Sequence, residues 1–131
     1  MSEVVRLTLV SHAMTDAMAA GRFPTDEPLN AVGHRQVDAS IDLGVTERAY
    51  CGPEKRTRQT AELLGLHATV DNRLADLDTG RWHGDQPAVV RAAILVVLNA
   101  PPKSFWRIDI APVSRTVMHF RGHAWTLRSS L

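Results

Sequence analysis

The stretch Val5-Arg6-Leu7-Thr8-Leu9-Val10-Ser11-His12-Ala13-Met14-Thr15 decides the fold, because an apolar run ends there in a polar turn. β-Branched and leucine side chains dominate residues 5–10, which predicts a β-strand buried on both faces. Gly21 and Pro24 follow soon afterwards and prevent a long helix in the next segment. Open α/β sheets bind ligands at the carboxyl ends of their strands, so His12 is the first candidate functional residue.

The composition is that of an ordinary folded domain. The chain has 131 residues, of which 44% are hydrophobic and 22% charged, and we expect one domain over residues 1–131. Fifteen basic and fourteen acidic residues give a formal net charge of +1, so bulk charge predicts neither a nucleic-acid partner nor a membrane partner. The lone Cys51 fits a reducing compartment, and the start has no basic signal-peptide region, so we expect a cytoplasmic protein.

The rest of the chain alternates short strand-like and helix-like segments. We expect a loop at 19–28, a helix at 29–43 that ends at Gly44, and a strand at 47–51. A helix at 54–64 that ends at Gly65, a strand at 66–70 and a loop at 71–84 should follow. The last elements are a nearly buried helix at 87–100 and a hairpin at 112–127 that turns at Arg121-Gly122. The valines near the end of the 87–100 segment also tolerate a strand.

The N-terminus of the helix predicted at 54–64 is a candidate anion site. Its unpaired N–H groups carry partial positive charge, and Lys55, Arg56 and Arg58 lie in or near its first turn. An equally good interpretation is a solvated basic turn without a ligand. Neither arginine stands at the spacing from Cys51 that a cysteine-phosphatase loop requires, so we interpret Cys51 as a small buried residue.

Three segments together resemble the histidine phosphatase superfamily, also called the phosphoglycerate mutase-like family. Leu7-Thr8-Leu9-Val10-Ser11-His12-Ala13 resembles its first strand and Arg-His-Gly motif, and residues 51–65, CGPEKRTRQTAELLG, resemble its arginine motif. Residues 74–84, LADLDTGRWHG, resemble its third motif, in which a carboxylic acid precedes a Gly-x-Trp-x-Gly turn. Residues 86–93 resemble the helix that follows the family's last catalytic histidine.

The resemblance implies an α/β fold, a three-layer α/β/α sandwich, and a site built around His12. His12 would take the phosphoryl group, Arg56 would bind it, and Asp76 would protonate the leaving alcohol. Asp78 is the competing candidate for the acid, and either carboxyl would need a raised pKa to carry a proton.

Two positions depart from the family pattern. Ser11 stands where the family has arginine, which leaves at most one hydrogen bond for phosphate, and Gln86 replaces the last histidine. Asp85 joins Gln86 directly where relatives have a helix and a strand between these two segments. Either the fold is reduced by this helix–strand segment, or the sequence lacks residues there.

The expected function is hydrolysis of small phosphate monoesters through a phosphohistidine, with a small phosphorylated molecule or phosphate as partner and no cofactor. The alternative is a catalytically degenerate relative that binds a phosphorylated ligand or a protein. The missing segment would leave a strand edge unpaired, so a homo-oligomer is a further expectation. His119 and His123 are spaced as a metal pair, but no carboxylate or cysteine is near them in sequence, so no metal is expected.

Overall fold

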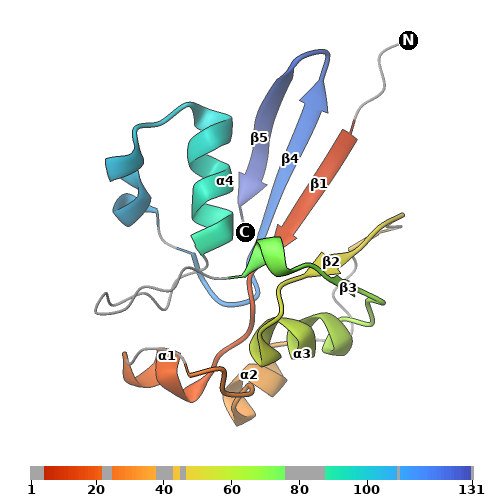
Figure 1. The fold of residues 1–131 in the computed structure, drawn as a ribbon, viewed down its shortest axis with the longest axis vertical. Coiled ribbons are helices and arrows are strands. Elements are labelled where there is room, and N and C mark those ends of the chain that lie inside the picture. Colours follow the sequence, from red (N-terminus) through yellow and green to blue (C-terminus); the bar gives the residue numbers. More distant parts are fainter. Residues whose placement is uncertain are drawn as a thin grey trace. The chain divides into compact units, whose positions relative to one another are not determined.

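The computed structural model describes residues 5–21, 25–37, 43–44, 47–75, 88–108 and 110–130. The chain divides into two compact units, which we call the terminal unit (Met1–Ser11 with Gln86–Leu131) and the central unit (His12–Asp85). Figure 1 follows the elements along the chain, in the order β1 (Val5–Val10), α1 (Asp16–Ala20), α2 (Ala31–Gln36), β2 (Tyr50–Cys51), α3 (Lys55–Leu63), β3 (Thr69–Val70), η1 (Asn72–Leu74), α4 (Ala88–Leu98), η2 (Pro102–Arg107), β4 (Arg115–Arg121) and β5 (Ala124–Ser130).

The terminal unit is a three-stranded antiparallel sheet with a helix on one face. The strand order is β1-β4-β5, so the first strand of the chain pairs with a strand more than a hundred residues later, with Leu7 opposite Met118. Helix α4 lies beside the β4–β5 hairpin (Figure 1). The core joins the helix to the sheet and consists of Val90, Ile94, Ile110 and Met118.

The central unit contains α1, α2, α3 and a short parallel pair formed by β2 and β3. Its buried apolar side chains are mostly small: Ala13, Ala17, Leu29, Cys51 and Ala61. Small side chains bury little area, so hydrogen bonds between side chains and backbone carry much of the local order here.

Polar side chains begin the helices of the central unit. Thr15 caps α1 by accepting from Met18 N, and Asn30 caps α2 by accepting from Gly33 N at 2.8 Å. The first helical N–H of α3, that of Lys55, instead donates to the carboxylate of Asp26 at 2.8 Å.

Most of the predicted elements are confirmed. The strand at 5–10, the helices at 54–64 and 87–100 and the hairpin are present, and the two short strands occupy the ends of their predicted ranges. Helix α2 is shorter than predicted because Val37 already has an extended backbone; residues 38–42 lie outside the described part. The five-residue helix α1 was not expected, and it takes Ala19 and Ala20 from the predicted loop.

Two predictions about burial are wrong. Val5 and Leu7 of β1 are exposed, because α4 covers one face of a small sheet and does not reach this end of the strand. Helix α4 is less buried than predicted. Val90, Arg91 and Ile94 are buried, but Val96 is 77% exposed and Leu98 is 55% exposed. One face of α4 packs on the sheet, η2 and Ile108 also contact the helix, and Val96 and Leu98 lie on its exposed side. No helix in the described ranges is long and apolar enough to cross a membrane.

Candidate active site

His12 follows β1 by two residues and is buried, with 6% of its surface exposed. Its ring Nδ1 lies 2.8 Å from the carbonyl oxygen of Ala13. A carbonyl oxygen only accepts hydrogen bonds, so Nδ1 carries the proton in this arrangement. The lone pair of the neutral imidazole is then on Nε2, which is the nitrogen assigned to any nucleophilic role.

Thr60 connects the histidine turn to helix α3. Its Oγ1 accepts a hydrogen bond from Ala13 N at 3.0 Å and donates one to the carbonyl oxygen of Arg56 at 2.8 Å. Thr60 and Arg56 are each 4% exposed, and Ala13 is fully buried. One hydroxyl therefore brings the backbone beside His12 and the backbone of Arg56 together, so the structure places these two candidate residues in the same neighbourhood.

Two glutamine side chains bind further backbone N–H groups around this turn. Gln36 of α2 accepts from Met14 N at 2.9 Å, and Gln59 of α3 accepts from Leu29 N at 2.7 Å. These contacts and the one made by Thr60 were not predicted from the sequence. Gln59 and Thr60 lie inside the arginine motif, but nothing in the sequence shows that their side chains bind backbone N–H groups far away in the chain.

Gly33 lets α2 approach the histidine turn closely. A Cβ at this position would overlap the carbonyl oxygen of Met14 and would lie 3.0 Å from its nitrogen. Asn30 N donates to the same carbonyl oxygen at 3.1 Å, so the helix start and the turn are in direct contact. Only glycine fits here, because backbone atoms cannot move aside as a flexible side chain does.

Arg56 lies in the first turn of α3, as predicted, but it is buried rather than solvated. Lys55 and Arg58, its basic neighbours, are exposed. A buried guanidinium is costly unless an opposite charge or good acceptors compensate it. Its burial therefore distinguishes Arg56 from Lys55 and Arg58, whose exposed charges are explained by solubility alone.

Ser11 directly follows β1 in the terminal unit and is 2% exposed. Its hydroxyl donates to the carbonyl oxygen of Ala111 at 2.6 Å and accepts from Ser114 N at 2.9 Å. A serine hydroxyl has a single proton, so Ser11 would donate to phosphate only after releasing Ala111. Its phosphate-binding role stays a prediction.

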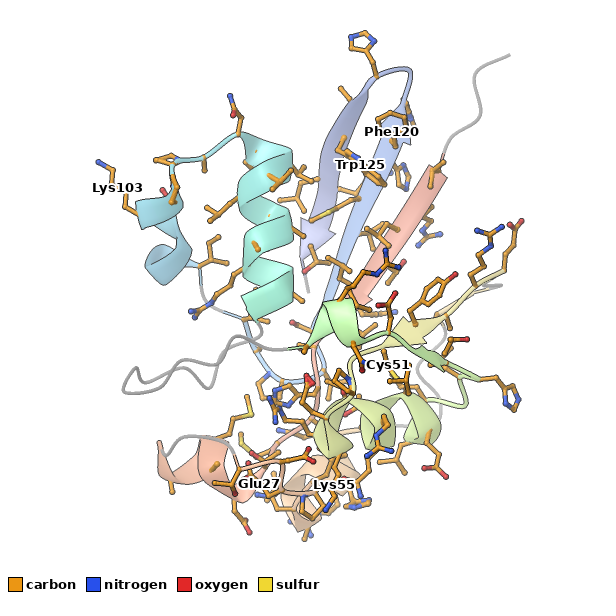
Figure 2. The ribbon with its side chains drawn as sticks, in the orientation of Figure 1. Glu27, Cys51, Lys55, Lys103, Phe120 and Trp125 are labelled. Atoms are coloured by element: carbon orange, nitrogen blue, oxygen red, sulfur yellow. The ribbon has the colours of Figure 1, made fainter. Side chains whose placement is uncertain are left out.

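Cys51 is the last residue of β2 (Figure 2), and its side chain is buried. Burial raises the pKa of its thiol, with the positive charge of Arg58 opposing and the negative charge of Glu54 adding to the rise. A raised pKa lowers the thiolate fraction at neutral pH, which is the opposite of what a nucleophilic cysteine needs.

The remaining candidates are not brought together by the described residues. Asp76, Asp78 and Gln86 lie outside the described ranges. His119 lies within β4 and His123 in the hairpin turn, and the described part of the chain holds no cluster of three or more metal-ligating side chains.

Comparisons with solved structures show which fold this chain has. The fold matches a putative α-ribazole-5′-phosphate phosphatase from Escherichia coli at 17% identity and a TM-score of 0.79, covering 94% of both chains. It matches Entamoeba histolytica phosphoserine phosphatase in complex with 3-phosphoglyceric acid at 16% identity and a TM-score of 0.76, covering 95% of both. It also matches mycobacterial glucosyl-3-phosphoglycerate phosphatase in complex with VO3 at 19% identity and a TM-score of 0.77, covering 94% of this chain and 96% of that one.

These likenesses confirm the mixed α/β, phosphoglycerate mutase-like fold. A comparison with curated protein sequences gives no match. The sequence profile of the histidine phosphatase superfamily (branch 1) matches residues 7–91, which include the His12 turn and the whole of α3. The chain therefore belongs to the histidine phosphatase superfamily, branch 1.

Proposed function

We propose that this protein hydrolyses small phosphate monoesters through a phosphohistidine formed on His12. Family membership supports the phosphatase class, and three phosphatases share the fold. Two of those structures are complexes with 3-phosphoglyceric acid and with VO3, which motivates small phosphorylated substrates for this chain.

In the proposed reaction Nε2 of His12 attacks the phosphorus atom, and the bond from phosphorus to the ester oxygen breaks. Arg56 binds the phosphoryl oxygens, and Asp76, or Asp78 in its place, gives a proton to the departing alkoxide. Water then attacks the phosphohistidine and loses a proton to the same carboxylate, which releases inorganic phosphate and restores the neutral imidazole. Splitting one displacement into two makes each step easier.

The observation that carries the proposal is the polar link through Thr60 in the central unit. A nucleophile and an anion-binding arginine must be held in fixed relation for phosphoryl transfer, because positioning supplies most of the rate enhancement. Here the Thr60 hydroxyl bonds to the backbone beside His12 and to the backbone of Arg56. The Nδ1 proton on the Ala13 carbonyl further supports attack by Nε2.

Hydrolysis of p-nitrophenyl phosphate tests the proposal. We expect turnover by the wild type and a loss of more than about 10³-fold in His12→Ala, which lacks the nucleophile. Arg56→Ala should lose about 10²–10³-fold, the usual cost of removing one donor to a developing charge. Arg58→Ala is the matched control, because it removes an exposed arginine two residues away on the same helix. Equal rates in the wild type and His12→Ala would refute the proposal.

The alternative is a phosphate-binding protein without turnover, and Ser11 favours it. The family arginine is replaced by a serine whose proton is donated to Ala111, so this position contributes no cation. In that case tungstate would raise the melting temperature of the wild type, as a ligand specific for the folded state does, and Arg56→Ala would abolish the rise. Protection without any His12-dependent hydrolysis would select this alternative.

A further inference from the structure

The charges of the chain are distributed unevenly between its two units. The terminal unit contains seven Lys and Arg residues against two Asp and Glu residues, and the central unit contains eight against twelve. The two acidic residues of the terminal unit, Glu3 and Asp109, both lie outside the described residues. Its described part therefore contains no carboxylate side chain. The near-neutral total charge, the basis for expecting no nucleic-acid partner, conceals this separation.

The strand register places cations on the sheet face opposite α4. Met118, Leu7 and Leu127 are opposite one another across the three strands, and Met118 and Leu127 pack with α4. Side chains alternate between faces along a strand, so the neighbouring set points the other way. In that set Arg6 is opposite His119.

Arg121 lies two residues beyond His119 on β4 and shares its face. Arg128 is the extra residue of the irregularity where Met118 pairs with Leu127 and Val117 with Ser129, so the register alone does not assign its face. Its charge acts on His119, which places it with the other two arginines. Arg6, Arg121 and Arg128 are all exposed. We call these three arginines with His119 the basic sheet face.

His119 reports the positive potential of this face. Burial lowers the pKa of its imidazole, and the charges of Arg128, Arg121 and Arg6 lower it further. Its Nδ1 is buried without a hydrogen-bond partner among the described residues. Like charges close together on one face repel one another, and an anion bound over them would relieve that repulsion.

We propose that the basic sheet face binds the phosphodiester backbone of single-stranded nucleic acid. The cations are all arginines from three different strands, and the guanidinium fork matches phosphate oxygens in two-point contacts. An extended peptide would instead be expected at a strand edge, where free backbone groups and side-chain pockets select it. Phe120 and Trp125, whose ring centroids are 5.2 Å apart, belong to the α4 side by register, so binding is electrostatic and indifferent to sequence.

Fluorescence anisotropy with a labelled oligothymidylate and the full chain tests this inference. We expect a dissociation constant of ~10⁻⁴ to 10⁻⁶ M that weakens with salt, with a log–log slope of about −2 for three neutralised phosphates. Replacing Arg6, Arg121 and Arg128 together by glutamine should weaken binding by about tenfold or more and bring the slope near zero. Arg128→Gln alone should remove about a third of the slope, which keeps the test available if the triple variant does not fold.

The matched control replaces three exposed cations elsewhere, Arg35, Arg48 and Lys103, by glutamine, which changes the net charge equally. Lys103 points away from the sheet (Figure 2). The control should bind like the wild type. Equal loss in both triple variants would overturn the inference, as would tighter binding of polyglutamate than of oligothymidylate at equal charge, or displacement by millimolar inorganic phosphate at constant ionic strength. Self-association that the Arg6, Arg121 and Arg128 variant abolishes would assign the face to a second copy and would also overturn it.

Discussion

The Thr60 hydroxyl accepts a hydrogen bond from the backbone N–H of Ala13 at 3.0 Å, across 47 residues of sequence. Both residues are buried, so no water replaces this bond if it is lost. The same hydroxyl donates to the Arg56 carbonyl oxygen, so Thr60 links the backbone beside His12 to the backbone of Arg56.

Thr60→Val should disrupt this link at nearly constant volume. The Ala13 N–H would be buried without an acceptor, which costs about 1–3 kcal/mol of unfolding free energy. If His12 is the nucleophile, its displacement should lower kcat by about 10- to 100-fold. Urea unfolding and p-nitrophenyl phosphate kinetics measure the two effects.

Thr60→Ser is the control, because it keeps the hydroxyl and loses only a methyl group, worth about 0.8 kcal/mol. The serine variant should retain most of kcat. Equal kcat losses in the valine and serine variants would show that the hydroxyl does not position the site.

Gly33→Ala should be strongly destabilising although it adds one methyl group in a helix. The added Cβ would overlap the Met14 carbonyl, and relieving overpacking costs about 1–3 kcal/mol. His34→Ala changes an exposed neighbour in the same helix and should unfold at nearly the wild-type urea concentration. Unchanged stability in Gly33→Ala would mean that α2 does not contact the histidine turn as described.

The sequence predicts local features of this fold well and long-range partners poorly. Gly65 and Gly122 mark a helix end and a hairpin turn because each has the left-handed φ that glycine favours, and such signals act over a few residues. The antiparallel pairing of Leu7 with Met118 has no local signal. The sequence also predicts too much burial for β1 and α4, because burial depends on which distant segments cover each face, and these leave no local signal.

The candidate site shows the same division. The resemblance predicts His12 and Arg56 as site residues, and in the structure one hydroxyl bonds to the backbone beside His12 and to the backbone of Arg56. The sequence does not identify Thr60 as the residue that supplies this hydroxyl, because it does not show which atoms the Thr60 side chain contacts. Ser11 was expected to face phosphate, and its bond to Ala111 depends on a turn a hundred residues away.

Ser11→Arg, which restores the family residue, should not restore a stronger phosphate site. Ser11 is buried and binds both Ala111 and Ser114, so the larger charged side chain would break these bonds and overpack the end of β1. Overpacking alone should lower the unfolding free energy by about 1–3 kcal/mol. Thermal unfolding with and without tungstate measures the outcome. A more stable variant with stronger tungstate protection would contradict the described role of Ser11.

Cys51 should be chemically quiet. Its raised pKa keeps the thiol protonated at neutral pH, so iodoacetamide should label it more slowly than free glutathione until the pH exceeds that raised pKa. Cys51→Ala should keep the hydrolytic rate of the wild type within about twofold, as expected for a residue outside the chemistry. A Cys51→Ala variant as inactive as His12→Ala would instead indicate a cysteine nucleophile.

Trapping the phosphoenzyme tests the central claim most directly. The wild type is mixed with p-nitrophenyl phosphate, quenched within the first turnovers under conditions that preserve phosphohistidine, and mapped by peptide mass spectrometry. Our account predicts a phosphoryl group on His12, attached through Nε2, that forms and decays at the rate of turnover and is absent from His12→Ala. Turnover without phosphorylation of His12, or a phosphoryl group on another residue, would contradict it.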